Sequence, residues 1–473
     1  MNKLYKIHMG AAECALDLGD GSERGEYVNQ DYILNVLGRP HRSVGLMYTY
    51  YPNDSHWSEN KISVTCKDME IHFQWDYPYD DYFPYGEKGQ PFEQMKDIRR
   101  HGQDVFLTLT IDCSLDDEAL RKIARELKPY GRMRLRINHE CSGTWFTHNR
   151  RFSYEEVGKF FVRFANIVKE EAPNITTVFC AGFARNEDGS VEQEEAFAEA
   201  YRTADEWSGD AYLALHYGWP FDIAEKGGSS HSCGCVEDNF NLFKRTFQRL
   251  TLLNGGKAKP MITAELNSDG DVTGAADQGE SVCRFYERIR SEKASWFKSV
   301  SFYQFRDRGR LGLETEDPNN PSVGIPQPIL NEYKKVLKDP YFMPKMQVGD
   351  EAQLPAALRW GGAEDADGLA LKILFESNPV FCEITFEQPL SLMLEINGKW
   401  FYKSPQVKTV DLMPAFYEKP LDKAESLLLK IYATPAEGVN PDSGADDWTE
   451  NYYAELTEMP SLRVRYEPVG TVK

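Results

Sequence analysis

Eight short segments rich in β-branched and apolar residues alternate with longer amphipathic stretches from the N-terminus to about Phe342. Such alternation is typical of parallel strands joined by helices. Eight strand–helix repeats in one chain predict a closed (β/α)8 barrel of the TIM type, an α/β fold. The expected strands are residues 4–10, 43–51, 104–112, 132–138, 175–182, 211–218, 260–266 and 299–305.

Helix signals and loop lengths fit this barrel. Ser153-Tyr-Glu-Glu is a capping-box pattern that opens a helix, and Ser114-Leu-Asp-Asp opens another, which ends at Pro129 and Gly131. One connection, residues 52–92, is long and rich in Tyr, Asp and Pro, and it follows the second expected strand. Loops that follow strands lie at the C-terminal end of a barrel, where active sites are built. We therefore expect this segment to border the site.

The pattern changes after residue 348. Short alternating strands now follow one another, separated by Gly, Pro, Asn and Asp turns, and Asn397-Gly398 is a strong hairpin signal. This arrangement predicts a small antiparallel β-sandwich. We expect a catalytic barrel over residues 1–344 and an accessory C-terminal sandwich domain over residues 345–473.

The charge balance narrows the classes of ligand. The chain has 54 Lys and Arg against 74 Asp and Glu, a formal net charge of −20. This field repels phosphate backbones and anionic lipids, so the sequence argues against nucleic-acid and membrane partners. The start of the sequence lacks an apolar run of signal-peptide length, which favours a cytoplasmic location for the chain as written. A secreted protein from which the signal peptide had been removed would show the same start of the sequence.

The nine cysteines are odd in number and scattered, which favours reduced thiols over a disulfide framework. Cys233 and Cys235 alone stand close together, and their spacing differs from the two-residue gap of zinc knuckles. The simpler interpretation is a glycine-rich loop with two free thiols, and we expect no metal site.

The segment around Glu140 carries the strongest chemical signal. Alternation along residues 132–138 places Arg134, Arg136, Asn138 and Glu140 on the face opposite the apolar residues. The apolar face should pack on the helices, so the polar face points into the barrel. Buried charge of this kind is costly unless it is paired or functional.

A second carboxylate, Glu265, ends the seventh expected strand. Carboxylates at strand ends four and seven face each other across the barrel mouth, and a separation of about 5–5.5 Å is that of a retaining glycosidase. Arg136, with His216 or Tyr217 after strand six, could keep Glu265 ionised as the nucleophile. The competing interpretation is that both glutamates form ordinary ion pairs with Arg134 and Arg136.

The residues from 136 to 146, Arg-Ile-Asn-His-Glu-Cys-Ser-Gly-Thr-Trp-Phe, resemble the Arg-x-x-His-Glu-x-x-Gly-x-Trp-Phe segment of glycoside hydrolase family 26. That family belongs to the clan A retaining glycosidases, whose catalytic glutamates follow strands four and seven. Weaker likeness extends over most of residues 25–310. The resemblance implies five roles, namely acid/base for Glu140, nucleophile for Glu265, neighbouring subsite residue for His139, sugar platform for Trp145 and partner of the nucleophile for Tyr217.

Two segments depart from the family pattern. Glu265-Leu266-Asn267 is closer to the Glu-Phe-Asn ending of family 39 enzymes, which also carry β-sandwiches. The eighth strand gives Tyr303-Gln304 where many clan members place a tryptophan, so Gln304 becomes a candidate substrate-binding residue. The subsite for the reacting sugar is therefore expected to differ from that of a mannanase.

Other aromatic and basic residues have two interpretations each. Trp219 after strand six either stacks on substrate or packs its loop, and Trp57 and Trp75 could wall the cleft. Arginines 306, 308 and 310 either form a solvated face or contact an acidic sugar. The tryptophans of the second domain fit a sandwich core better than a binding platform: Trp360, Trp400 and Trp448.

These features together predict a retaining glycoside hydrolase that acts on β-mannan, β-glucan or a related oligosaccharide and needs no cofactor. The alternative is a barrel that binds carbohydrate but has lost turnover, motivated by the departures around Glu265 and Gln304. A metal-dependent barrel hydrolase fits poorly, because it needs a His-x-His pair on the first strand, where only His8 occurs.

Overall fold

The computed structural model of the chain describes residues 3–19, 26–52, 80–81, 89–143, 148, 151–181, 190–214, 236–270, 274–307, 310–435 and 451–467. Within these residues, no helix is both long enough and apolar enough to cross a lipid bilayer.

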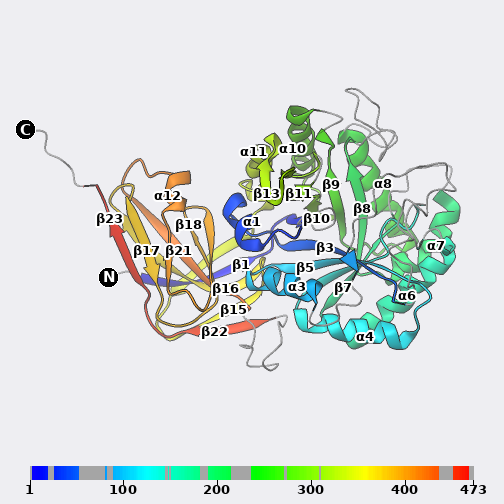
Figure 1. Cartoon of the computed structure of the whole chain (residues 1–473), viewed down its shortest axis with the longest axis horizontal. Coiled ribbons are helices and arrows are strands. Elements are labelled where there is room, and N and C mark those ends of the chain that lie inside the picture. Colours follow the sequence, from blue (N-terminus) through cyan, green and yellow to red (C-terminus); the bar gives the residue numbers. More distant parts are fainter. Residues whose placement is uncertain are drawn as a thin grey trace, which may run out of the picture.

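Eight parallel strands close into the predicted barrel (Figure 1). The order around the sheet is β2-β10-β9-β8-β7-β6-β5-β3, and pairing between β2 and β3 closes the ring. The strands are β2 (Ala15–Gly19), β3 (Ser43–Tyr50), β5 (Asp104–Ile111), β6 (Met133–Ile137), β7 (Ile175–Cys180), β8 (Glu206–Tyr212), β9 (Met261–Asn267) and β10 (Phe297–Phe302). The two-residue β4 (Asp80–Asp81) pairs with β3.

Helices surround the barrel and bury their apolar faces against its outer surface. The helices are α1 (Gln30–Leu37), α3 (Gln90–Arg100), α4 (Asp117–Leu127), η4 (Lys128–Tyr130), α6 (Tyr154–Glu171), α7 (Ser190–Thr203), α8 (Val236–Leu253), α10 (Ala275–Glu292), α11 (Pro328–Val336) and η5 (Pro340–Phe342). The predicted capping box at Ser153 is present, with Glu156 as its partner. Helix α4 begins later than expected, because Asp116 rather than Ser114 caps it.

The expected first barrel strand was wrong. Residues Lys3–Gly10 form β1, which pairs antiparallel with β14 (Lys345–Glu351) and β16 (Asp365–Phe375) outside the barrel. Its buried residues, Leu4, Ile7 and Met9, are separated by exposed or half-buried ones, which is typical of a strand with one covered face and an irregularity between Tyr5 and Ile7. The true first barrel strand, β2, is short and carries a buried Asp17, so it lacks a clear apolar pattern.

The sixth barrel strand is also displaced from its expected position. It covers Glu206–Tyr212 rather than residues 211–218. Its inward side chains include Glu206 and Asp210, which pair with Arg134 and Arg136 of β6. Because these polar residues weaken the apolar pattern, the sequence favoured the more apolar segment that follows.

The strands from β14 onward, together with β1, form the antiparallel sheets of the predicted sandwich, which are an eight-stranded sheet that includes β1 and a three-stranded sheet β20-β17-β23. Asn397 and Gly398 both have positive φ, +56° and +89°, as the predicted hairpin turn requires. The elements are β15 (Ala356–Gly362), β17 (Phe381–Thr385), β18 (Leu392–Ile396), β19 (Lys399–Lys403), β20 (Thr409–Asp411), α12 (Pro414–Glu418), β21 (Glu425–Ala433), β22 (Tyr452–Leu456) and β23 (Ser461–Arg465).

The sandwich packs against the end of the barrel where the strands begin (Figure 1). Buried Trp360 lies against Gly102, and Arg132 donates to the carbonyl of Gly361 over 2.6 Å. Gly102 and Arg132 directly precede β5 and β6, so this contact covers the N-terminal end. The C-terminal end is left for the site, where a small hairpin of β12 (Glu314–Asp317) and β13 (Asn320–Pro326) pairs with β11 (Arg306–Asp307).

Candidate active site

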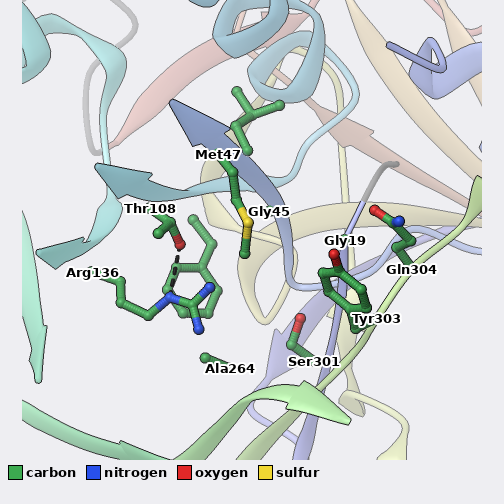
Figure 2. A pocket seen from close by; sticks show the side chains of 11 residues that line it. Gly19, Gly45, Met47, Thr108, Arg136, Ala264, Ser301, Tyr303 and Gln304 are labelled. Atoms are coloured by element: carbon green, nitrogen blue, oxygen red, sulfur yellow. Dashed lines mark hydrogen bonds between the residues drawn. The ribbon is translucent and has the colours of Figure 1, made fainter. Parts of the chain in front are cut away.

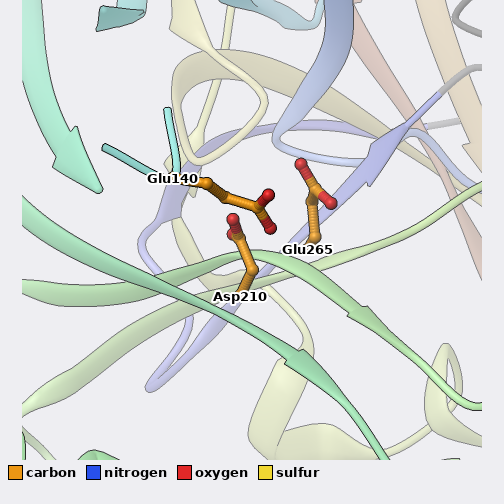
Figure 3. Close-up of side chains that lie close together, drawn as sticks. All are labelled: Glu140, Asp210 and Glu265. Carbon is orange, nitrogen blue, oxygen red and sulfur yellow. The ribbon is translucent and has the colours of Figure 1, made fainter. Parts of the chain in front are cut away.

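Three carboxyl groups converge at the C-terminal end of the barrel (Figure 3). Glu140 follows β6, Asp210 lies on β8 and Glu265 lies on β9. One carboxylate oxygen from each lies within 4.8 Å of one from each of the others. Asp210 and Glu265 are buried, and Glu140 is half-buried.

Glu265 faces inward because β9 contains a bulge. Ile262 and Ala264 already point into the barrel, where they pack with Phe106, so strict alternation would turn Glu265 outward. The register with β8 passes from Gly209 opposite Thr263 to Asp210 opposite Glu265, which leaves one extra residue in β9. Bulges next to active sites re-aim side chains in this way.

Glu140 reaches the cluster through a left-handed turn. Asn138 has φ +47° and Glu140 has φ +51°. The Asn138 amide accepts from the backbone N–H of Ile111 over 2.7 Å and donates to its carbonyl over 3.0 Å. Asn138 therefore extends the strand pairing with its side chain and anchors the turn that presents Glu140.

Arg136 links the cluster to the barrel wall. Its guanidinium donates to Glu265 Oε1 over 2.7 Å and to Asp210 Oδ1 over 3.2 Å. A third donor, Nε, reaches the Thr108 hydroxyl at 2.8 Å (Figure 2). The arginine is 1% exposed, so these bonds satisfy a fully buried charge.

Tyr212 completes the surroundings of Glu265, because its hydroxyl donates to Glu265 Oε2 over 2.6 Å. Sequence reasoning missed both Tyr212 and Asp210, since it placed the sixth strand too late and looked for these groups at His216 and Tyr217. The signal that could have found them is the alternation of Ser208, Asp210 and Tyr212 on one strand face.

The three carboxyl groups of the cluster cannot all be ionised at low cost in free energy. Burial raises the pKa of Asp210 well above its ordinary value, repulsion from Glu265 and Glu140 raises it further, and Arg136 only partly offsets this. One guanidinium cannot balance three carboxylates, so the cluster favours a proton on Asp210.

A small hollow lies beside Arg136 within the barrel (Figure 2). Gln304 borders it, and its amide donates to Asp307 over 3.1 Å. A Cβ on Gly19 would stand 3.2 Å from the Cβ of Gln304, so the glycine makes room for this side chain. The lining is otherwise mixed, and consists of Gly45, Leu46, Met47, Phe106, Thr108, Arg136, Ala264, Ser301 and Tyr303.

His139 precedes Glu140 and is 2% exposed. Burial lowers the pKa of His139 well below its ordinary value, and the nearby charges of Arg136 and His148 lower it further. The imidazole is therefore neutral and suits hydrogen bonding rather than charge pairing.

The three carboxyl groups are also the only candidate cation ligands among the described residues. Arg136 already donates to two of them, so a cation would have to displace or oppose a buried guanidinium. The donor set therefore fits an arginine-paired acid cluster better than a metal centre.

Several other candidates from the sequence have different surroundings. Arg306 is buried and pairs with Glu314 over 2.9 Å, so it is neither solvated nor open to an acidic sugar. Trp360 belongs to the sandwich core, and Trp400 stacks on Tyr432 beside it. The candidates from the sequence that lie outside the described part of the chain are Trp57, Trp75, Trp145, His216, Tyr217, Trp219, Cys233, Cys235, Arg308 and Trp448.

Three of the solved structures that resemble this one are glycoside hydrolases. A modular family 26 endo-β-1,4-mannanase from Cellulomonas fimi matches over 94% of both chains, with a TM-score of 0.45 and 11% identity. A family 39 glycoside hydrolase from Bacteroides cellulosilyticus WH2 matches over 89% of this chain and 80% of its own, at 0.42 and 11%. A family 51 α-L-arabinofuranosidase from Bifidobacterium longum matches over 90% and 97%, at 0.45 and 11%.

No family model matches the sequence, and no curated protein matches it either. At these levels of similarity, function has to be argued from the site itself.

Proposed function

We propose that the chain is a retaining glycoside hydrolase that cleaves a β-linked glycan, such as a β-mannan, a β-glucan or a related oligosaccharide. The observation that carries this proposal is the approach of Glu140 and Glu265, with carboxylate oxygens within 4.8 Å of each other. Retaining enzymes hold their two carboxyl groups about 5–5.5 Å apart, whereas inverting enzymes need about 6.5–9.5 Å to admit a water molecule.

Glu265 acts as the nucleophile. Arg136 and Tyr212 donate to its two oxygens, and such donors suit a carboxylate that attacks the anomeric carbon. As the bond from Glu265 to the sugar forms, the glycosidic bond breaks and its electron pair goes to the leaving oxygen.

Glu140 acts as the general acid and then as the general base. It gives its proton to the leaving oxygen in the first step. In the second step it takes a proton from water, whose oxygen attacks the anomeric carbon and releases Glu265. The half-buried position of Glu140 is compatible with contact to both the leaving group and water.

Gln304 bears on the substrate class. Gln304 borders the hollow next to Arg136, and its amide donates to Asp307, at a position where many clan A enzymes place a tryptophan ring. An amide hydrogen-bonds sugar hydroxyls, whereas an indole stacks on a sugar face. We therefore expect the reacting sugar to be held mainly through its hydroxyl groups.

Azide rescue of alanine variants tests the two roles separately. With an aryl β-glycoside that carries a good leaving group, Glu140→Ala should still form the glycosyl enzyme, and azide should restore turnover and give a β-glycosyl azide. Glu265→Ala should lose roughly 10⁴-fold in kcat, and azide should give the α-glycosyl azide instead.

The exposed Glu237→Ala on α8 is a matched control that should behave as the unmodified protein does. The alternative is a carbohydrate-binding barrel without catalysis. It would be favoured if the unmodified protein and both active-site variants bound mannan or glucan oligosaccharides equally and none of the three turned them over.

A further inference from the structure

We propose that Cys180 is a positioning residue of the acidic cluster, whose thiol donates to Asp210 and controls the proton that this carboxyl carries. This inference rests on the proposed function for its catalytic consequence. The contact itself is a property of the fold and can be measured without turnover.

Cys180 is the last residue of β7 and is fully buried. Its Sγ lies 3.3 Å from Oδ2 of Asp210 on the neighbouring strand β8. Sulfur hydrogen bonds are longer than those of oxygen, so this distance is that of a thiol donor with a carboxylate acceptor. Cys180 thus contacts the cluster through Asp210.

The two oxygens of Asp210 have different neighbours. Oδ1 accepts from Arg136 Nη1 at 3.2 Å, and Oδ2 faces the thiol. A guanidinium has donors only, so a proton on Asp210 cannot be directed toward Arg136. The proton therefore belongs on Oδ2, the same oxygen that the thiol contacts.

The thiol and the proton consequently compete for Oδ2. When Asp210 is ionised, the S–H group donates to Oδ2 and stabilises the negative charge. When Asp210 is protonated, Oδ2–H needs an acceptor, and sulfur is a weaker acceptor than the carboxylates of Glu140 and Glu265. Cys180 thereby favours proton release from Asp210 and directs a retained proton toward the two glutamates.

The pH dependence of kcat/KM tests this role. The carboxyl groups of Glu140, Asp210 and Glu265 lose their protons as one coupled cluster, so the alkaline limb reports the last proton loss of the cluster rather than of one residue. Cys180→Ala removes a donor that stabilises the fully ionised cluster, so this limb should move up by about half a pH unit. Cys180→Ser restores a hydroxyl donor and should return the limb to its original position or below it. Cys283→Ala, on α10 and remote from the cluster, should leave the profile unchanged. Superimposable profiles for Cys180→Ala, Cys180→Ser and the unmodified protein would overturn the inference.

Infrared difference spectra test the contact without activity. The S–H stretching band that Cys180→Ala removes belongs to Cys180. In Asp210→Asn, Arg136 should keep the amide oxygen on its side, which turns the amide nitrogen toward Cys180 and removes the carboxylate acceptor that faces the thiol. The band should then move to higher frequency.

An unmoved Cys180 band in Asp210→Asn would overturn the inference even if the enzyme is a retaining glycosidase. A moved band in a protein without glycosidase activity would keep the contact and reject the proposed function. The two failures are therefore distinguishable.

Discussion

Arg136 dominates the electrostatics of the site at the scale of single residues. It is buried, and it donates to Asp210, Glu265 and Thr108 at once. A buried charge of this kind is tolerated because its partners satisfy it, and removing one partner leaves an uncompensated group. The planar guanidinium also fixes where each carboxylate oxygen lies, which a lysine could not do.

Tyr212→Phe should weaken catalysis with little effect on folding. The change removes the hydroxyl that donates to Glu265 Oε2 but keeps the ring. Hydrogen bonds to charged groups are worth about 1.5–3 kcal/mol, so kcat/KM should fall about 10- to 100-fold. Steady-state kinetics measure this effect, and urea unfolding provides the control. A loss below two-fold would remove Tyr212 from the description of the nucleophile.

The site residues that sequence reasoning named share one property. Glu140 and Glu265 stand at or just after the ends of strands whose outward faces are apolar and whose positions were predicted correctly, so their place in the barrel could be inferred. Asp210 was missed because its strand is polar inside, and the bulge in β9 was not foreseen. Both features depend on partners in neighbouring strands, which a local pattern does not record.

At the scale of elements, His101 joins three parts of the fold. It follows α3, bonds Asp31 of α1 at 2.9 Å, contacts Asp97 within α3 and packs on Tyr402 of β19. Burial alone would lower the pKa of His101, but hydrogen bonds and charge interactions with Asp31 and Asp97 outweigh burial and raise it to about 9.

This contact should make stability depend on pH. Because the pKa of His101 is higher in the folded than in the unfolded chain, its contribution is complete below about pH 6.5 and is lost as the pH rises through about 9. Asp31 is largely exposed, which screens part of the effect. We expect a loss of about 2 kcal/mol in the free energy of unfolding across this range.

Urea unfolding at several pH values measures this loss, and His101→Gln is the control variant. The variant should be less stable than the unmodified protein at pH 6.5 and should approach it near pH 9. Parallel pH curves for the two proteins would contradict the assignment to His101.

At the scale of the whole molecule, the sandwich packs against the end of the barrel where the strands begin. Its strand β1 comes from the start of the chain, lies between β14 and β16, and pairs with residues more than 330 positions away, for example Tyr5 with Glu351. The barrel was predictable because its repeats are local and numerous. The place of β1 was not, because its partners are remote in sequence and its own pattern fits either fold.

Trp360→Ala should therefore destabilise the whole chain. Trp360 is fully buried in the sandwich core and touches Gly102 of the barrel. Loss of a buried tryptophan costs about 3–5 kcal/mol, and we expect barrel and sandwich to unfold together at the lower denaturant concentration. Calorimetry and circular dichroism measure this. Leu374→Ala, on exposed β16 surface, should change stability by less than about 0.5 kcal/mol. Separate transitions for the two parts would contradict the coupling.

The central claim is that Glu265 forms a covalent bond to the sugar, and trapping that bond tests it most directly. The full-length protein is incubated with an activated 2-deoxy-2-fluoro β-glycoside of gluco or manno configuration, digested and mapped by mass spectrometry. We predict one added glycosyl group, on the peptide that contains Glu265 and on that residue. A label on Asp210 or Glu140, or an inverted first-formed product without any label, would contradict the mechanism.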